Sequence, residues 1–369
     1  MNSSILNWKW FEPKYRWMTL GGLTILVRIL VSWMPNSVET FYSRGIYQGI
    51  RWLIDNTVAR SPIPLFYFLV AFLIYYAYRS YKSWQAIQSL SFKSKLQHIG
   101  LAIGNALGFI IFTFLVLWGF NYARVPIEKQ IDIKASTLNL KEIIAEAKWA
   151  TQEAIHARKL IPNTDTFALD STFLPKGNLQ EIMREHLVKV LKKYNYPTTG
   201  RVRGRQLFPK GLLMRFSTSG VYLPWIGEGH VDGGLHPLQL PFTLAHEMAH
   251  GYGHGDEGTC NFLAYLACIE SGDPFLIYAG TLTYWRYAAS EYKYFKPESY
   301  QMYRTATLTQ EMHNDLEAIY ANNDKYPDIL PWMRDTAYDT YLKFQGIEEG
   351  IENYSRVVTL VRGWRLKGK

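Results

Sequence analysis

The sequence predicts an α-helical transmembrane anchor followed by an α+β domain that is mainly helical and contains a small sheet. Three observations support this fold class. Long apolar stretches fill the first third of the 369 residues, helical apolar periodicity dominates the rest, and one short segment is rich in β-branched and aromatic residues. We therefore expect a membrane domain at residues 1–125 and a second domain at residues 126–369.

The predicted anchor contains three transmembrane helices, at about residues 17–34, 63–78 and 99–120. Each stretch is near the roughly 20 residues that a spanning helix needs, although the second is short. A secretory signal peptide is the alternative for the first stretch. We disfavour it because the run is long, lacks a small-x-small cleavage site and contains Arg28, which would snorkel or face another helix.

The distribution of basic residues predicts the orientation of a multi-pass protein in the cell membrane. Basic residues before the first stretch and between the second and third place the amino terminus in the cytoplasm and the second domain outside it. These residues are Lys9, Lys14 and Arg16, then Arg79, Lys82, Lys93 and Lys95. The net charge of +9 favours binding to anionic lipids, so we expect the lipid bilayer to be a partner. Without a zinc ribbon, a recognition helix or a dense basic tract, we expect no nucleic-acid partner. No feature of the sequence specifies an oligomeric state.

The second domain is expected to begin with helices at residues 138–160 and 179–194. The segment 211–226 suits one or two strands, and the Gly-, Pro- and Asp-rich segment 227–237 is typical of a loop. Helices are expected from there almost to the end of the chain. Cys260 and Cys268 are eight residues apart on one of them, a rise of about 12 Å, which is too far for a disulfide.

The motif HEMAH at residues 246–250 is the first sign of chemistry. His246 and His250 are four residues apart, so a helix projects both imidazoles from one face, where they can bind one Zn²⁺. Glu247 lies beside them, placed to take a proton from a zinc-activated water and pass it to a leaving amine. The residues around this polar set are apolar or small, and a helix that buries such a set needs a reason.

A third ligand is expected just after the motif. Glycines at 251, 253 and 255 break the helix, and Asp256 can cap a new one whose first turn contains Glu257. His246, His250 and Glu257 would then hold Zn²⁺ with water in the fourth position, the ligand count of a catalytic site. Asn261, four residues after Glu257, could hydrogen-bond a ligating side chain.

Other interpretations stay open at this point. The two motif histidines could be a core pair without metal, and Glu257 could be an ordinary carboxylate at a helix start. In that case Asp256 or His254 would be the next candidate ligand. Weaker candidates for a link to the metal are His230, His236 and Cys260.

These motifs resemble those of gluzincin-type integral-membrane zinc metallopeptidases, whose pattern is H-E-x-x-H followed by E-x-x-A-D/N. The chain resembles more closely the bacterial domain-of-unknown-function family 3810, which has amino-terminal spans and segments like LPFTLAHEMAH (240–250), EGTCNF (257–262) and YLKFQGIEEGIENYSRVV (341–358). Cys260 stands where the pattern has alanine, and Thr259 where the narrower family is expected to have an acidic residue. The resemblance implies a zincin-like domain.

The resemblance also implies where substrate binds. Peptidases of this clan bind the substrate as an extra strand along a sheet edge, and 216–225 is the candidate edge. The substrate-binding candidates are Phe216, Ser217, Thr218, Ser219 and Gly220. The segment around 354 is implied to lie near the site, which makes Tyr354 the candidate catalytic donor to an oxyanion, with Arg356 as a second candidate. For both segments a purely structural role is the alternative.

We therefore expect a membrane-bound zinc metallopeptidase that hydrolyses peptide bonds in a protein or peptide substrate. One alternative is another zinc amidohydrolase that acts on cell-envelope material. The other is a sensor or scaffold that has a zinc fold without turnover.

Overall fold

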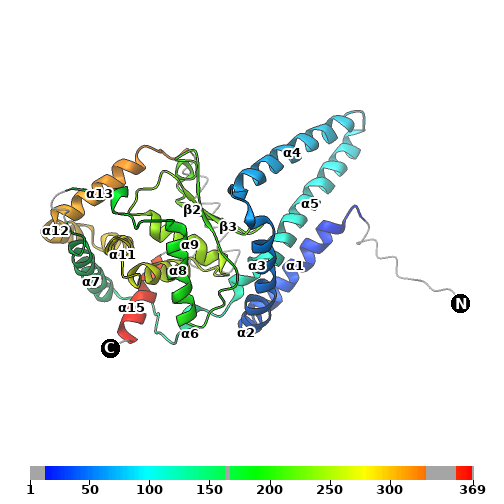
Figure 1. Ribbon diagram of the computed structural model, residues 1–369. Coiled ribbons are helices and arrows are strands. Elements are labelled where there is room, and N and C mark those ends of the chain that lie inside the picture. Colours follow the sequence, from blue (N-terminus) through cyan, green and yellow to red (C-terminus); the bar gives the residue numbers. More distant parts are fainter. Residues whose placement is uncertain (1–12, 163–166, 330–354, 368–369) are drawn as a thin grey trace. The chain divides into compact units, whose positions relative to one another are not determined.

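A computed structural model describes residues 13–162, 167–329 and 355–367 of the chain (Figure 1). The chain divides into two compact units. The amino-terminal unit is Met1–Arg124 with Pro224–Ile226, and the carboxy-terminal unit is Val125–Leu223 with Gly227–Lys369.

The described residues of the amino-terminal unit form helices and the short turns that connect them. Each of the three apolar stretches predicted from sequence falls largely within one helix, namely α1, α4 or α5. The elements are α1 (Arg16–Ser32), α2 (Pro35–Ser37), the π-helix η2 (Val38–Ile46), α3 (Tyr47–Asn56), the 3-10 turn η3 (Val58–Arg60), α4 (Leu65–Ala86), α5 (Phe92–Leu117) and the 3-10 turn η4 (Gly119–Ala123).

One or two of these helices are apolar enough to span a membrane. By length and composition α5 qualifies, and α1 qualifies together with the segment Pro35–Asn56, to which it is bent by 111°. The helix α4 is not among them, since its second half contains Arg79 and Lys82. The outward side of α5 carries large apolar side chains. These features fit association with a membrane.

Helices α1 and α5 run side by side and are packed through glycine (Figure 1). A Cβ atom on Gly108 would overlap the carbonyl oxygen of Trp17, and one on Gly21 would lie 2.6 Å from the Cα atom of Gly108. Gly104, one turn before Gly108, lies against Met18. Two small residues four positions apart are a common means of bringing membrane helices together.

The carboxy-terminal unit contains most of the helices and the sheet. The helices predicted at 138–160 and 179–194 are confirmed as α7 and α8. The elements are α6 (Ile127–Gln130), α7 (Leu140–Lys159), η5 (Ser171–Phe173), α8 (Leu179–Lys193), β1 (Gly204–Leu207), η6 (Met214–Phe216), β2 (Gly220–Leu223), β3 (Glu228–Asp232), α9 (Leu240–Gly251), α10 (Glu257–Ile269), α11 (Pro274–Phe295), α12 (Pro297–Thr307), α13 (Gln310–Asn323) and α15 (Val357–Lys367).

The sheet has three strands in the order β1-β3-β2, with β1 parallel and β2 antiparallel to β3. The prediction of a loop at 227–237 is wrong, because the first half of this segment is the central strand β3. Of the one or two strands expected in 211–226, the structure has one, β2, and the strand β1 was not predicted. The strand β3 consists mainly of polar residues and glycine, a composition that is typical of a loop. In the fold all five of its residues are buried.

Helices α9 and α10 form the centre of this unit. The helix α9 packs on the sheet, and α10 packs against α9, α8 and α11. Every residue of α10 except the last is buried. Cys260 and Cys268 are both buried free cysteines, so the expectation that they form no disulfide is confirmed.

Candidate metal centre

The polar residues of the HEMAH motif are buried in the core. His246, Glu247 and His250 on α9 are 7%, 4% and 6% exposed, and Glu257 on α10 is 2% exposed. Burying four titratable side chains in one place is costly unless they interact with one another or with a bound ion.

His246, His250 and Glu257 converge on one point. The Nε2 atoms of the two histidines are 3.2 Å apart, and Oε2 of Glu257 lies 3.1 Å from Nε2 of His246 and 3.4 Å from Nε2 of His250. One ligand atom from each residue lies within 4.8 Å of the others, so the three could together hold a metal ion. The structure thus brings together the three residues that the sequence predicted as ligands.

The turn between the two helices brings Glu257 to the histidines. After α9 ends at Gly251, Gly253 adopts a left-handed conformation with φ of 89°, which favours glycine. Asp256 then caps α10 by accepting a 2.6 Å hydrogen bond from the backbone N–H of Thr259. Glu257 is the first residue of α10, so its side chain faces back toward α9.

Each histidine is held by a hydrogen bond on its outer nitrogen. Nδ1 of His246 lies 2.8 Å from Oδ1 of Asn261, and Nδ1 of His250 lies 2.7 Å from the backbone carbonyl oxygen of His254. Both acceptors favour an N–H on Nδ1, and Nε2 of each ring is the nitrogen directed at Glu257. Asn261 is therefore found in the position predicted for it, and its side chain also hydrogen-bonds Tyr287 of α11.

Glu247 lies against the sheet beside this cluster. A Cβ atom on Gly229 of β3 would lie 2.7 Å from Cβ of Glu247, and one on Gly220 of β2 would overlap its Oε1 atom. A larger residue at position 229 would meet the backbone of Glu247, and one at position 220 would displace the carboxyl group of Glu247. Burial raises the pKa of Glu247 to about 7, against the lowering effect of the two histidines. The carboxyl group can therefore exchange a proton near neutral pH.

The charges of the cluster favour an ionised Glu257. Burial opposes ionisation of Glu257, but the two histidines outweigh it and hold its pKa well below the ordinary value. Cys260 contacts Nδ1 of His250 at 3.3 Å, and burial raises the pKa of its thiol to about 12. Cys260 thus faces Nδ1 of His250, on the side of the ring away from Glu257, and is not part of the cluster of candidate ligands.

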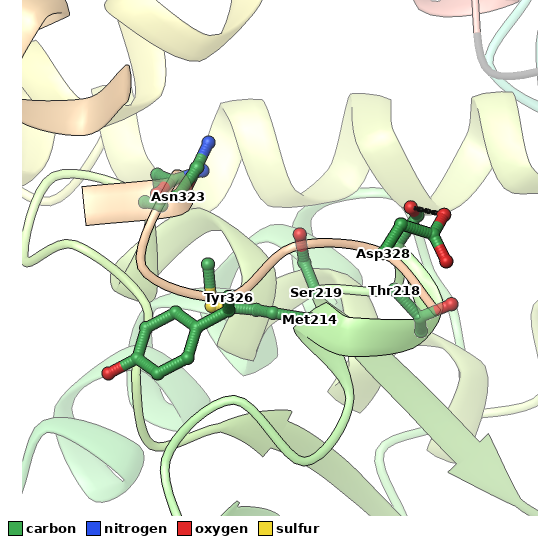
Figure 2. A pocket seen from close by; sticks show the side chains of 8 residues that line it. Met214, Thr218, Ser219, Asn323, Tyr326 and Asp328 are labelled. Atoms are coloured by element: carbon green, nitrogen blue, oxygen red, sulfur yellow. Dashed lines mark hydrogen bonds between the residues drawn. The ribbon is translucent and has the colours of Figure 1, made fainter. Parts of the chain in front are cut away.

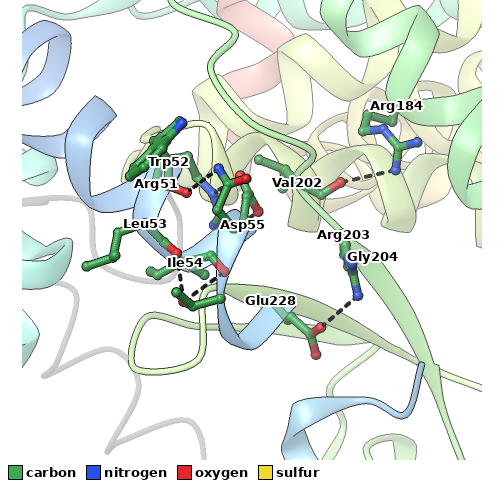
Figure 3. Close-up of polar contacts among 12 residues, drawn as sticks. Arg51, Trp52, Leu53, Ile54, Asp55, Arg184, Val202, Arg203, Gly204 and Glu228 are labelled. Carbon is green, nitrogen blue, oxygen red and sulfur yellow. Dashed lines mark hydrogen bonds and ion pairs between the residues drawn. The ribbon is translucent and has the colours of Figure 1, made fainter. Parts of the chain in front are cut away.

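The weaker candidates lie elsewhere. Since Gly229 faces Glu247, the flanking residues Glu228 and His230 face the other side of the sheet, where Arg203 approaches Glu228 (Figure 3). Nδ1 of His236 accepts a hydrogen bond from the backbone N–H of Leu238. None of the weaker candidate ligands named above, Asp256 and His254 included, belongs to the cluster that the described residues form.

The structure describes only one of the two carboxy-terminal residues that were candidates for the oxyanion donor. Tyr354 lies outside the described residues, and its role stays a prediction. Arg356 donates to Oδ1 of Asp256 and to Oε2 of Glu128, both at 2.6 Å. Its guanidinium thus binds the capping residue that directly precedes Glu257, which points to support of that candidate ligand and away from a role as oxyanion donor.

The candidate substrate segment divides into two parts. Gly220 begins the edge strand β2 and touches Glu247. Phe216 ends the short helix η6, and Ser217 follows in a left-handed conformation. Ser217, Thr218 and Ser219 line a cavity beside the strand.

Sequence reasoning missed the residues that hold Glu247 in place. Gly220 and Gly229 come from different strands, and their role depends on the pairing of those strands. One signal was available in Glu228–Asp232: polar residues alternate with Gly229 and Val231, which is the period of a strand. The supporting contact of Tyr287 had no signal in the sequence.

Comparison with known proteins leads to a family. No curated protein and no solved structure matches the chain significantly. A family model described as "Protein of unknown function (DUF3810)" matches residues 42–362, and the chain therefore belongs to that family.

Proposed function

We propose that this protein is a membrane-bound zinc metallopeptidase of the gluzincin type. The observation that carries the proposal is the convergence of His246, His250 and Glu257 beside a second buried carboxylate, Glu247, at the edge of a sheet. Two imidazoles and one carboxylate, with a further carboxylate next to them, are the groups that a hydrolytic zinc site requires.

The distances in the cluster fit zinc. In a tetrahedral site with metal–ligand distances of about 2.0–2.1 Å, two ligand atoms lie about 3.3–3.4 Å apart. The separations among His246, His250 and Glu257 are 3.1, 3.2 and 3.4 Å. The hydrogen bonds on both Nδ1 atoms are also typical of histidines that bind zinc through Nε2.

The protein's own residues would then perform the proton transfers. Zinc in this position would supply a water of lowered pKa and would polarise the carbonyl of the scissile bond. Glu247 would accept the proton of the attacking water and deliver it to the leaving amine, a role suited to its pKa of about 7. Asn261 would orient His246, and Gly220 and Gly229 would keep the carboxylate close to the strand.

The edge strand supplies a binding surface for a peptide. The backbone N–H of Asp232 donates to the carbonyl of Ser219, so Ser219, Val221 and Leu223 are the residues bonded to β3. Because bonded and non-bonded pairs alternate, Gly220 and Tyr222 direct their backbone groups to the outer side of β2. A peptide added there would place a backbone carbonyl next to Glu247.

The test is metal analysis and peptide cleavage by the wild type and by Glu247→Gln. We expect about one zinc per chain in both proteins, cleavage by the wild type, and a loss of rate in the variant of about 10²- to 10⁴-fold. Equal cleavage by both proteins would remove Glu247 from the mechanism. Zinc without peptide cleavage would favour the amidohydrolase, if cell-envelope fragments are hydrolysed, or the non-catalytic sensor, if they are not.

We further propose three membrane spans, with the amino terminus in the cytoplasm and the carboxy-terminal unit outside it. Both native cysteines are buried, so introduced thiols can be labelled selectively. Lys176→Cys should react with an impermeant thiol reagent in intact cells, and Ser89→Cys, between α4 and α5, only after permeabilisation. The reverse pattern would invert the topology.

A further inference from the structure

The carboxy-terminal unit has a basic cavity away from the candidate metal centre. The cavity beside β2 is lined mainly by hydroxyl and amide groups, with one carboxylate and no basic residue (Figure 2). The basic cavity, of about 250 Å³, lies where α11 and α12 meet and includes one residue of α13. Three of its nine lining residues are cations at neutral pH and none is acidic. The cations are Arg286, Lys293 and Arg304, and the other lining residues are Trp285, Ala289, Ser290, Tyr300, Gln301 and Tyr320.

The positions of the three cations follow from the two helices. Arg286 and Lys293 are seven residues apart on α11, which places them on one face of that helix. The helix α11 ends at Phe295, and Pro297 occupies the first position of α12. This short break lets α12 pack against α11, and it brings Arg304 to the cavity that the two cations of α11 line.

The base of the cavity is fixed by packing. Trp285, Ala289 and Tyr300 are buried there. The indole N–H of Trp285 donates a 3.0 Å hydrogen bond to Oγ1 of Thr151 on α7. The ring of Tyr300 packs edge-on against Tyr292 of α11, with 5.6 Å between ring centroids. The two helices that carry the cations are therefore held together below the cavity.

The three cations have no acidic partner in the part of the chain that the structure describes. Most arginines there in the carboxy-terminal unit form ion pairs, and Arg362 and Arg365, for example, share one buried carboxylate. Arg286, Lys293 and Arg304 form no ion pair with any described residue. The two arginines are only partly exposed, so solvent screens their charges incompletely. Three like charges around one cavity create a positive potential that favours a bound anion.

We propose that this basic cavity binds a phosphate group, an inference that does not depend on the proposed peptidase function. Phosphate carries up to two negative charges, and a guanidinium group can bind two of its oxygens at once. A carboxylate has a single charge and would offset the three cations less completely. Ser290, Tyr300 and Gln301 supply neutral donors beside the cations. Soluble phosphate esters and lipid headgroups share this chemistry, and the test separates the two sources.

The test is calorimetric titration of the full-length protein in detergent micelles with inorganic phosphate at constant ionic strength. We expect Arg286→Gln and Arg304→Gln each to weaken phosphate binding about 10- to 100-fold. Arg304→Lys should give an intermediate affinity, because it keeps the charge and loses the fork of donors. Arg215→Gln, which removes an exposed arginine outside the cavity, is the matched control and should bind phosphate as the wild type does.

The arginine variants identify the cavity, since phosphate could also contact a metal ion held by the motif histidines. No phosphate binding by the wild type, or equal affinity in the wild type and both glutamine variants, would overturn the inference. Competitors then separate the sources. Displacement of phosphate by glycerol 3-phosphate alone would assign the cavity to a soluble ester, and displacement by phosphatidic acid added to the micelles would assign it to a lipid headgroup.

Discussion

The helices α5 and α9 are both apolar, yet they use their apolar residues in opposite ways. The 26 residues of α5 turn large apolar side chains outward and meet α1 through glycines. In the 12-residue α9 every residue except Thr243 is buried, and the three ionisable side chains of the helix point inward. One helix presents an apolar exterior, and the other encloses a polar centre.

This difference shows that apolar composition alone does not identify a membrane helix. At 1.5 Å per residue α9 is about 18 Å long, too short for a hydrocarbon layer of about 30 Å, whereas α5 is about 39 Å long. The position of the polar groups is equally informative. A short buried helix with clustered titratable groups is typical of a functional site, because burial of such groups is otherwise destabilising.

The largest expected effect is on the polar centre of α9. Zinc sites with four protein ligands bind with roughly 10–16 kcal/mol, or about 3–4 kcal/mol per ligand, so Glu257→Ala should weaken zinc binding about 10²- to 10³-fold. The measurement is competition with a chelator of known affinity. Glu311→Ala, which removes a carboxylate from the first turn of α13, is the matched control and should bind zinc as the wild type does. Unchanged affinity in Glu257→Ala would exclude it as a ligand.

The second prediction concerns the pH dependence of stability in the metal-free protein. Glu247 has a pKa of about 7 in the folded state and an ordinary value of 4.5. Below pH 4.5 the carboxyl group is protonated in both states. As pH rises toward 7 the unfolded chain loses the proton first, so the wild type loses stability until the folded group also ionises. The loss is about 3 kcal/mol, at about 1.4 kcal/mol per pKa unit.

Glu247→Gln isolates this effect because the amide resembles the protonated acid and does not titrate. We expect the free energies of unfolding of the two proteins to diverge between pH 4.5 and 7, in the presence of a chelator, with the variant more stable above pH 7. Parallel curves would show that Glu247 is not destabilised by burial.

The sequence predicted those parts of the site whose residues lie close together along the chain. The spacing of His246 and His250, the glycine-rich turn and the cap at Asp256 all lie within a dozen residues, and together they predicted Glu257 and Asn261. The regular helices α7 and α8 were predicted for the same reason, since their apolar periodicity is local and α7 begins with a capping box.

The parts that were missed depend on pairing between distant segments. The strand β3 has buried charged residues whose partners, such as Arg203 and Arg205, come from around β1, so its sequence is typical of a loop until the sheet is known. The cavity beside β2 joins residues 214–219 to residues 323–328, about a hundred positions away. Such contacts leave no periodicity in the sequence, because neither segment specifies the other.

The third prediction tests the apolar helix. In α5, a Cβ atom on Gly108 would overlap the backbone of α1, whereas one on Gly100 would meet no atom within 4 Å. Gly108→Val should therefore destabilise the amino-terminal unit by about 1–3 kcal/mol, the usual cost of overpacking, and Gly100→Val should have little effect. Unfolding in SDS, followed by loss of helical circular dichroism, measures the difference. Equal midpoints for the two variants would mean that α1 and α5 do not depend on close contact.

The smallest expected effect is at Arg356, and it tests how the polar centre is supported from a distance. Arg356 connects Asp256, the cap of α10, to Glu128. Arg356→Gln should free the cap and weaken zinc binding about 10-fold, at the lower end of the effect of residues that orient ligands. Arg362→Gln, which breaks ion pairs to Glu142 and Glu146, is the control.

Two readouts separate this role from the role of an oxyanion donor. If Arg356 supports Glu257, Arg356→Gln should lower zinc affinity, and saturating zinc should restore most of kcat. Arg356→Lys should give an intermediate affinity, because an ammonium keeps the charge but cannot bind both carboxylates in the same fork. If instead Arg356 stabilises an oxyanion, kcat should fall with zinc affinity unchanged and excess zinc should restore nothing. The second pattern would mean that the ion pair with Asp256 breaks when substrate binds.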